Sequence, residues 1–454
     1  MTVGPLLERF AACGEQEAIG WQGQVVTYAW LLEQMAADRQ WLAQRQIEPG
    51  SVVMLEADFS PRAVSMLLVL LERNCMLVPV SHQVASKKES WRDISQTEWR
   101  IRFDAQDQVE AFRRPVQAVH PFYAQLRKLN HAGLVLFSSG TTGTSKAAVH
   151  DVTKLMKKYR QQRHNYRTIS FLLFDHIGGL DTLLYALSNG SCLITIRDRS
   201  PDAVCQAIET FRAEVLPVSP TFLKLFLLSE AYERYDLSSL KYITYGTEVM
   251  PEATLKKLNA LFPQVKLLQK YGTTEVGTLR SKSRSSDSLW VKIGGEGYET
   301  RVVDGMLQIK AESAMLGYLN APSPFTTDGW FMTGDAVEVD GEYVRIRGRK
   351  SEMINVGGEK VYPAEVEQVI EAMEGIAEVL VYGEAHALTG QIVCAVIRPL
   401  RPLSEKESRS YWMRQVRTHC RQQLEAFKIP VRITVTEEPL HSTRFKKMRK
   451  PGSS

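Results

Sequence analysis

Closely spaced cysteines are missing from this sequence. The six cysteines stand far apart, at positions 13, 75, 192, 205, 394 and 420, and none forms a Cys-x-x-Cys motif. Disulfide frameworks and cysteine-ligated zinc sites both need closer spacing, so the pattern indicates neither. We therefore expect a reducing compartment, the cytoplasm.

The sequence also lacks a long hydrophobic run. Its longest apolar stretch, residues 63–71, falls far short of the roughly 20 residues that a membrane-spanning helix needs. Residues 1–8 lack the basic segment and apolar core of a secretory leader. These features predict a protein without membrane insertion.

Neither sign of charge dominates. The chain has 56 basic and 51 acidic residues, a formal net charge of +5, which gives no argument for nucleic acid as a partner. Hydrophobic residues make up 44% and charged residues 24% of the 454, values that exclude disorder as the main description. A chain of this length exceeds what one hydrophobic core organises, so at least two domains are expected.

One loop is dense in hydroxyl groups and glycine. Residues 137–146 read Phe-Ser-Ser-Gly-Thr-Thr-Gly-Thr-Ser-Lys, directly after the apolar run 134–137. Glycines let backbone N–H groups turn toward an anion, hydroxyls add donors and Lys146 adds positive charge, so we expect a phosphate-binding loop. A Walker A loop is excluded, because Ser145 stands five residues after Gly140, where that motif needs glycine. An ordinary Ser/Thr/Gly-rich surface loop is the alternative.

Short apolar runs alternate with amphipathic segments through the first half of the chain. The runs with the composition of buried strands are residues 52–55, 77–80, 169–174, 192–196 and 215–218. Such alternation predicts an α/β fold with sheets flanked by helices. From about Gly294 short strands and turns predict a β-rich subdomain within the same large domain.

The last hundred residues predict a small α+β domain. A helix is expected from Pro363, strands at 379–382 and 393–397, and a long polar helix at 405–426. We place the domain boundary at 348–351, which gives a large N-terminal domain, residues 1–348, and a small mobile C-terminal domain, residues 349–454.

Four motifs follow one another in the order that one family shows. They are residues 138–146, the Tyr-Gly-Thr-Thr-Glu of 271–275, the Gly-Trp-Phe-Met-Thr-Gly-Asp of 329–335, and the Gly-Arg-Lys of 348–350 running into 357–367. On these motifs the chain resembles the adenylate-forming, or AMP-binding, superfamily of acyl- and aryl-CoA ligases, peptide-synthetase adenylation domains and luciferases. The resemblance spans nearly the whole chain.

The resemblance implies an ATP-dependent ligase that joins an acid to a thiol. A carboxylic acid would attack the α-phosphate of ATP and release pyrophosphate, and the acyl-AMP would then pass its acyl group to a pantetheine thiol. ATP and Mg²⁺ are the implied cofactors, and CoA or the phosphopantetheine of an acyl or peptidyl carrier protein is the implied acceptor. Two alternatives remain open: an amino-acid-activating enzyme that loads a carrier protein, and a non-catalytic nucleotide-binding protein.

The resemblance also assigns residues to ATP. The implied ATP-binding residues are Ser138, Ser139, Gly140, Thr141, Thr142, Gly143, Lys146, Tyr245, Gly246, Thr247, Tyr271, Gly272, Thr273, Asp335 and Arg349. Thr274 would contact the α-phosphate, Glu275 with Thr142 would bind the metal, and Asp335 would accept hydrogen bonds from the ribose. Tyr245 and Tyr271 would cover the two faces of adenine, although Tyr245 could equally close the end of a strand.

The acid pocket is expected around residues 174–180. His176 and Gly179 match the His-x-x-Gly segment of acyl- and aryl-CoA ligases, with Phe174 and Asp175 beside the substrate. In amino-acid-activating relatives a Phe-Asp pair here binds the substrate ammonium. Against that, Asp175 immediately precedes an expected helix, where a cap contributes about 1 kcal/mol, and we favour the cap. Gly179 could admit substrate or serve close packing.

The C-terminal domain is implied to rotate between two reactions. Ser351 stands at the hinge, where many relatives have Asp or Lys, and Gly357 with Gly358 would line the acceptor tunnel or simply form a hairpin turn.

The tail departs from the family pattern Thr-x-x-Gly-Lys. The best register places Ser442 at the threonine, Phe445 at the glycine and Lys446 at the catalytic lysine, with Lys447 as a substitute. A solvated basic end at 444–450 is the other interpretation.

Overall fold

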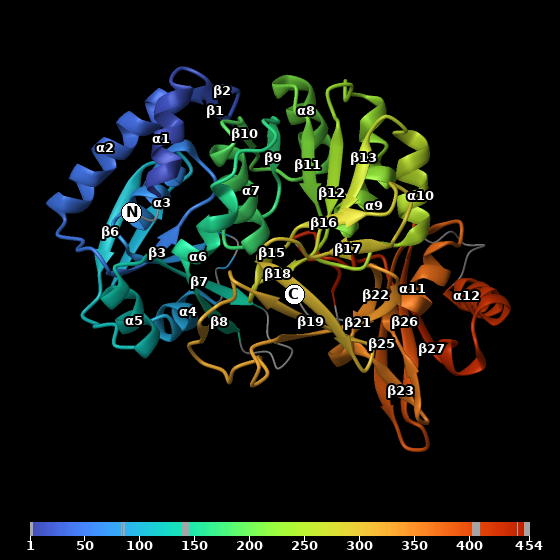
Figure 1. Cartoon of the computed structure of the whole chain (residues 1–454). Coiled ribbons are helices and arrows are strands. Elements are labelled where there is room, and N and C mark those ends of the chain that lie inside the picture. Colours follow the sequence, from blue (N-terminus) through green and yellow to red (C-terminus); the bar gives the residue numbers. More distant parts are fainter. Residues whose placement is uncertain are drawn as a thin grey trace.

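The computed structural model describes residues 3–82, 84, 87–138, 145–401, 409–442 and 444–448. Figure 1 shows the large domain, with one sheet around β3 and β7 on the left and a second around β9 to β13 at the top. The C-terminal elements lie at the lower right of that view, beyond a β-rich region. The α/β fold with a second, smaller domain is confirmed.

The first large sheet carries the predicted phosphate loop. Its strands, in spatial order, are β20 (Gly317–Tyr318), β8 (Lys146–Asp151), β7 (Gly133–Ser138), β4 (Met76–Val80), β3 (Val52–Glu56), β5 (Trp99–Phe103) and β6 (Val109–Arg113). The strands expected at 52–55 and 77–80 are confirmed as parts of β3 and β4. β7 and β8 are antiparallel and Ser138 pairs with Lys146, so the two ends of the loop meet.

The second large sheet is parallel except for its first hairpin. Its strands, in spatial order, are β13 (Lys266–Gln269), β12 (Tyr242–Tyr245), β11 (Val215–Val218), β9 (Thr168–Ser170), β10 (Leu193–Thr195), β1 (Glu17–Trp21) and β2 (Gln24–Thr27). The strand expected at 169–174 ends early, because the chain turns after Phe171 and the Leu173 carbonyl accepts the His176 N–H at 3.0 Å. That turn, not a strand end, presents the predicted acid-pocket residues.

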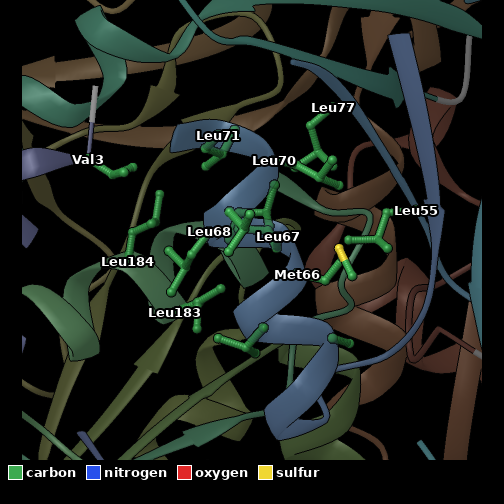
Figure 2. Close-up of a cluster of buried hydrophobic side chains, with 14 of the residues drawn as sticks. Val3, Leu55, Met66, Leu67, Leu68, Leu70, Leu71, Leu77, Leu183 and Leu184 are labelled. Carbon is green, nitrogen blue, oxygen red and sulfur yellow. The ribbon is translucent and has the colours of Figure 1, made fainter. Parts of the chain in front are cut away.

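Helices cover both sheets. They are α1 (Gly4–Cys13), α2 (Tyr28–Gln44), α3 (Pro61–Glu72), α4 (Lys88–Ile94), α5 (Pro121–Leu129), α6 (Val152–Met156), α7 (Ile177–Ser188), α8 (Pro201–Phe211), α9 (Pro220–Ser229) and α10 (Glu252–Leu261). Ser60, Ser200 and Ser219 each precede a proline and cap α3, α8 and α9 through their side-chain oxygens. In Figure 2 leucines of α3 lie beside Leu183 and Leu184 of α7, within a hydrophobic cluster that also contains residues of β3 and β10.

A six-stranded antiparallel sheet forms the β-rich region. Its strands, in spatial order, are β16 (Ser281–Ser283), β17 (Val291–Ile293), β22 (Tyr343–Arg349), β21 (Phe331–Asp340), β19 (Met306–Ala311) and β18 (Tyr298–Val303). Asp335 of β21 pairs in register with Arg349 of β22. The short hairpin β14 (Gly272–Thr273) and β15 (Gly277–Thr278) carries the Tyr-Gly-Thr-Thr-Glu motif.

The C-terminal elements start after β22, where a short 3₁₀ turn spans Lys350–Glu352. They are β23 (Ile354–Val356), β24 (Glu359–Val361), α11 (Pro363–Glu371), β25 (Ile376–His386), β26 (Gly390–Pro399), α12 (Arg409–Gln423) and β27 (Arg432–Val435). The helix expected from Pro363 and the strands expected at 379–382 and 393–397 are confirmed. Within the described ranges, no helix has the length and apolar character to cross a membrane.

Gly179 is required by close packing. A Cβ at this position would lie 2.1 Å from the Leu173 carbonyl oxygen, a backbone atom that cannot move without the turn. We expect Gly179→Ala to lower the free energy of unfolding by ~1–3 kcal/mol, as overpacking of a filled core does. Gly178→Ala is the matched control, because its Cβ would mainly meet a methyl group of Leu172, which can rotate away. Chemical denaturation that shows equal losses for both variants would contradict this packing role.

Candidate active site

The ends of the phosphate loop are held on two strands. Lys146 begins β8, and its Nζ lies 5.4 Å from the centre of the Tyr318 ring, a cation–π distance. The Asn320 side chain accepts from the Ala147 N–H at 3.0 Å and donates to the Ser145 carbonyl at 2.9 Å. Five of the predicted ATP-binding residues, 139–143, lie outside the described residues.

Three of the sequence motifs meet around Asp335. Its carboxylate accepts from the Tyr271 hydroxyl at 2.5 Å and from Arg349 Nε at 3.1 Å. Asp335 is only 6% exposed, and burial raises the pKa of its carboxyl group although Arg349 and Tyr271 oppose the shift. The arrangement joins the 271–275, 329–335 and 348–350 motifs into one polar centre.

Glu275 and Thr274 are fixed by two side chains that sequence reasoning missed. The Tyr318 hydroxyl donates to Glu275 Oε1 at 2.5 Å, and His150 Nε2 donates to the Thr274 carbonyl at 2.6 Å. Burial lowers the pKa of His150, so the ring is neutral and its tautomer carries the proton on Nε2. Neither residue lies in a recognised motif, so only the folded contacts reveal them. A Cβ on Gly272, in the same hairpin, would lie 2.8 Å from both the Gly277 carbonyl oxygen and the Thr278 Cα, which leaves no room for a side chain.

Tyr245 lies in the core. It is 1% exposed at the end of β12 and belongs to a different hydrophobic cluster from Tyr271. This position agrees with the alternative of an aromatic residue that closes a strand end. The adjacent backbone is the unusual part: a Cβ on Gly246 would lie 2.6 Å from the Lys270 carbonyl, and Thr247 has a positive φ of 76°. A β-branched residue rarely adopts that conformation.

The expected cap at Asp175 is wrong. His176 caps α7 instead, because its Nδ1 accepts the Gly178 N–H at 3.1 Å. Asp175 is buried and its Oδ2 contacts Arg444 Nη2 at 2.6 Å and the Ser81 hydroxyl at 3.2 Å. The expected pocket residue Phe174 packs edge-on against Phe59 in the core.

The C-terminal tail reaches this turn. Lys446 Nζ lies 3.2 Å from His176 Nε2, and burial together with Lys446 and Arg444 holds the pKa of His176 well below its usual range. A neutral imidazole offers one acceptor, which the Gly178 N–H already uses, so Lys446 faces a ring nitrogen that carries a proton. An anion that lies beside both nitrogens could therefore accept a hydrogen bond from each.

Phe445 and Lys447, the neighbours of Lys446 in the tail, contact other parts of the molecule. Phe445, at the family's glycine position, has the positive φ of 53° that glycine favours, and its ring packs on Phe171 and Phe222. Lys447 Nζ lies 2.9 Å from Glu367 and 3.2 Å from Glu371. Of the two candidate lysines, Lys446 is the one beside His176.

Comparison with known families decides the membership. Residues 85–319 match the model of AMP-binding enzymes, and residues 365–447 match that of the AMP-binding enzyme C-terminal domain. The chain belongs to the AMP-binding enzyme family.

Relatives of this AMP-binding enzyme are acid–CoA ligases by name. An indoleacetate–CoA ligase of Aromatoleum aromaticum is 30% identical over 70% of the chain and 66% of the relative. A 2-succinylbenzoate–CoA ligase of Enterococcus faecalis is 28% identical over 69% of the chain and 67% of the relative. The chain thus spans about two thirds of the length of these relatives.

Solved structures share the fold. The anthranilate CoA ligase AuaEII, in complex with anthranoyl-AMP, superposes with a TM-score of 0.81 at 18% identity, covering 99% of this chain and 95% of that one. The amide bond synthetase McbA from Marinactinospora thermotolerans gives a TM-score of 0.78 at 20% identity, covering 99% and 98%.

In this AMP-binding enzyme the expected hinge and tunnel residues are exposed. Ser351 is exposed within the 3₁₀ turn after β22. Gly357 and Gly358 form the turn between β23 and β24, with φ of 62° and 99°, and a Cβ on either would meet nothing within 4 Å. The structure therefore shows a hairpin turn on the surface of the C-terminal domain.

Substitution of Asp335 should affect ATP binding and protein stability differently. Folding raises the pKa of the Asp335 carboxyl group. Such a group stabilises the folded state at low pH, where it is protonated, and this contribution is lost as pH rises through the folded pKa. At neutral pH the buried negative charge is therefore unfavourable for folding. We expect Asp335→Asn to leave the unfolding temperature unchanged or higher at pH 7. If Asp335 holds the ribose, KM for ATP rises about tenfold or more, since hydrogen bonds to charged groups are strong.

Asp340→Asn on the same strand is the control, because Asp340 pairs with Arg284 at an exposed position. Thermal unfolding and ATP-dependent activity measured on both variants decide the point. Destabilisation by Asp335→Asn without a change in KM would show a purely structural carboxylate.

Proposed function

We propose that the protein activates a carboxylic acid with ATP to form acyl-AMP and pyrophosphate, and then transfers the acyl group to a pantetheine thiol. The contact of Lys446 with His176 carries this proposal, because it brings a cation of the C-terminal domain to the turn where the acid is expected. The Tyr271–Asp335–Arg349 centre and Lys146 supply the nucleotide side of the same reaction.

Charge control explains the proposed roles. When a carboxylate attacks the α-phosphate, negative charge develops on phosphate oxygens and on the leaving pyrophosphate. Lys446 neutralises the attacking carboxylate and the α-phosphate, while Lys146 and the loop at its start hold the outer phosphates. Asp335 accepts the ribose hydroxyls, and Arg349 keeps that carboxylate in place.

Glu275 is the residue that would hold Mg²⁺. One carboxylate with substrate phosphates is a usual Mg²⁺ environment, and Glu275 is kept oriented by Tyr318. Among the described residues, no three His, Cys, Asp or Glu side chains are arranged so that they could hold a metal ion together. The ion would neutralise charge on the phosphates when bound. Thr142, the other expected ligand, lies outside the described residues.

The acid that we propose has no ammonium group. Asp175, which would bind such a group, already contacts Arg444 at 2.6 Å, so a second cation would meet a neutralised carboxylate. The relatives named for indoleacetate and 2-succinylbenzoate, and the neighbour that holds anthranoyl-AMP, support an aromatic acid. This favours the acid–thiol ligase over the amino-acid-activating alternative.

CoA is the acceptor that we propose. The names of the indoleacetate and 2-succinylbenzoate ligases both specify CoA, and a carrier-protein phosphopantetheine presents the same thiol. The exposed Gly357–Gly358 turn would line the thiol passage after the C-terminal domain rotates about Ser351.

Acid-dependent exchange of labelled pyrophosphate into ATP tests the function. Only a reversible acyl-AMP former supports it, so a non-catalytic nucleotide-binding protein gives none with any acid in an aryl, fatty and amino acid panel. We expect aromatic acids to support exchange. We expect Lys446→Ala to reduce exchange by about a hundredfold or more, because loss of a group that stabilises charge in the transition state has an effect of this size.

The same variant should still convert supplied acyl-AMP and CoA to the thioester. Lys282→Ala, an exposed lysine on β16, is the control for loss of a positive charge. Exchange that survives Lys446→Ala, or is driven only by amino acids, would overturn this assignment.

A further inference from the structure

The segment around Lys446 is bound by side chains on both of its flanks. Arg444 contacts Asp175 of the N-terminal domain, and the Phe445 carbonyl accepts from the Ser219 hydroxyl at 2.6 Å. After Lys446, the backbone N–H of Lys447 donates to Glu248 at 2.6 Å. The chain on each side of the lysine is thus attached to the N-terminal domain.

Lys447 also enters a charged cluster that spans the two domains. Its Nζ lies between Glu367 and Glu371, which are four residues apart on one face of α11 in the C-terminal domain. Lys224, on α9 of the N-terminal domain, lies 3.1 Å from the same Glu371 carboxylate. The labels α9 and α11 locate this contact in Figure 1.

The two carboxylates of the cluster are buried, and the two lysines are partly exposed. Glu371 is 4% exposed, and the two lysines formally neutralise Glu367 and Glu371. Burial alone would lower the pKa of Lys447, but Glu367 and Glu371 outweigh it and raise the pKa, so the lysine stays charged. Burial lowers the pKa of Lys224, and Glu371 only partly opposes that shift. Separating such partners leaves buried charges unpaired, which is strongly unfavourable.

Lys224 and Glu371 belong to different domains, so their contact depends on how the two domains are placed. The same holds for Arg444 with Asp175 and for the Lys447 backbone with Glu248. All three contacts occur in the placement that sets Lys446 beside His176. They therefore favour this placement, because moving the domains apart would take a cationic partner from the buried carboxylates of Glu371 and Asp175.

We infer that Arg444 and Lys447 are positioning residues, which act with Asp175, Lys224, Glu367 and Glu371 to hold Lys446 in the adenylating placement. This inference rests on the proposed function for its catalytic consequence. The contacts break when the C-terminal domain rotates for thioester formation, so they act on the first half-reaction alone.

Lys447→Met tests the inference, because it keeps the length of the side chain and removes its charge. We expect at least a tenfold fall in kcat for pyrophosphate exchange, little change in KM for the acid, and unchanged thioester formation from supplied acyl-AMP. Lys447→Arg restores most of the exchange. Arg432→Met, an exposed residue of β27 that pairs with Glu384, has no effect on either half-reaction.

Lys224→Met removes a partner of the same Glu371 carboxylate without a change in the tail. It therefore tests the inference even if Lys447→Met misfolds. It should show the same loss confined to exchange. Equal loss in both half-reactions, with a lowered unfolding temperature, would show that the cluster serves folding only. Undiminished exchange in both variants would show that Lys446 needs no such support.

Hydrogen exchange separates this inference from the proposed function, since it needs no substrate. Amides of residues 440–442 and 444–448 should exchange at least tenfold faster in Lys447→Met and Lys224→Met than in the parent protein or Arg432→Met. That result would support the positioning role of these residues even if no acid supports pyrophosphate exchange. Unchanged protection of this segment would overturn the inference even in an active enzyme.

Discussion

Pairing of buried charges between the domains is the interaction on which the site depends. Lys446 belongs to a short tail that has little structure of its own, yet it lies 3.2 Å from His176 because its neighbours are bound. Asp175 of the N-terminal domain pairs with Arg444. Glu371 of the C-terminal domain pairs with Lys224 of the N-terminal domain and with Lys447 of its own domain. We expect that without these pairs Lys446 would no longer be held beside His176.

The proposed nucleotide site, around Asp335, also contains a buried charge. The Asp335 carboxylate is buried against the Tyr271 hydroxyl and the Arg349 guanidinium, and burial raises the pKa of its carboxyl group. Such a group is unfavourable for stability and useful for binding, because a ligand with hydroxyl donors improves its environment. Tyr318 and His150 fix the neighbouring segment, so the donors and acceptors are oriented before substrates arrive.

Sequence alone predicted the parts of this arrangement that depend on local pattern. The apolar runs gave β3, β4 and β11, and the motifs at 271–275, 329–335 and 348–350 meet as expected. Long-range partners were beyond it. Asp175 precedes a helix and has a capping residue type, but Arg444, 269 positions later, takes its carboxylate while His176 caps α7. Tyr245 has the chemistry of a stacking residue, yet its place in the core is set by packing.

In the proposed reaction, a carboxylate attacks the α-phosphate of ATP at the site where Lys446 meets His176. Transfer of oxygen-18 tests it most directly. An acid labelled in both carboxylate oxygens, chosen because it supports pyrophosphate exchange, is converted to thioester and the products are analysed by mass spectrometry. Acyl-AMP chemistry leaves one labelled oxygen in AMP and none in pyrophosphate. Unlabelled AMP, or label recovered in inorganic phosphate, would contradict the account.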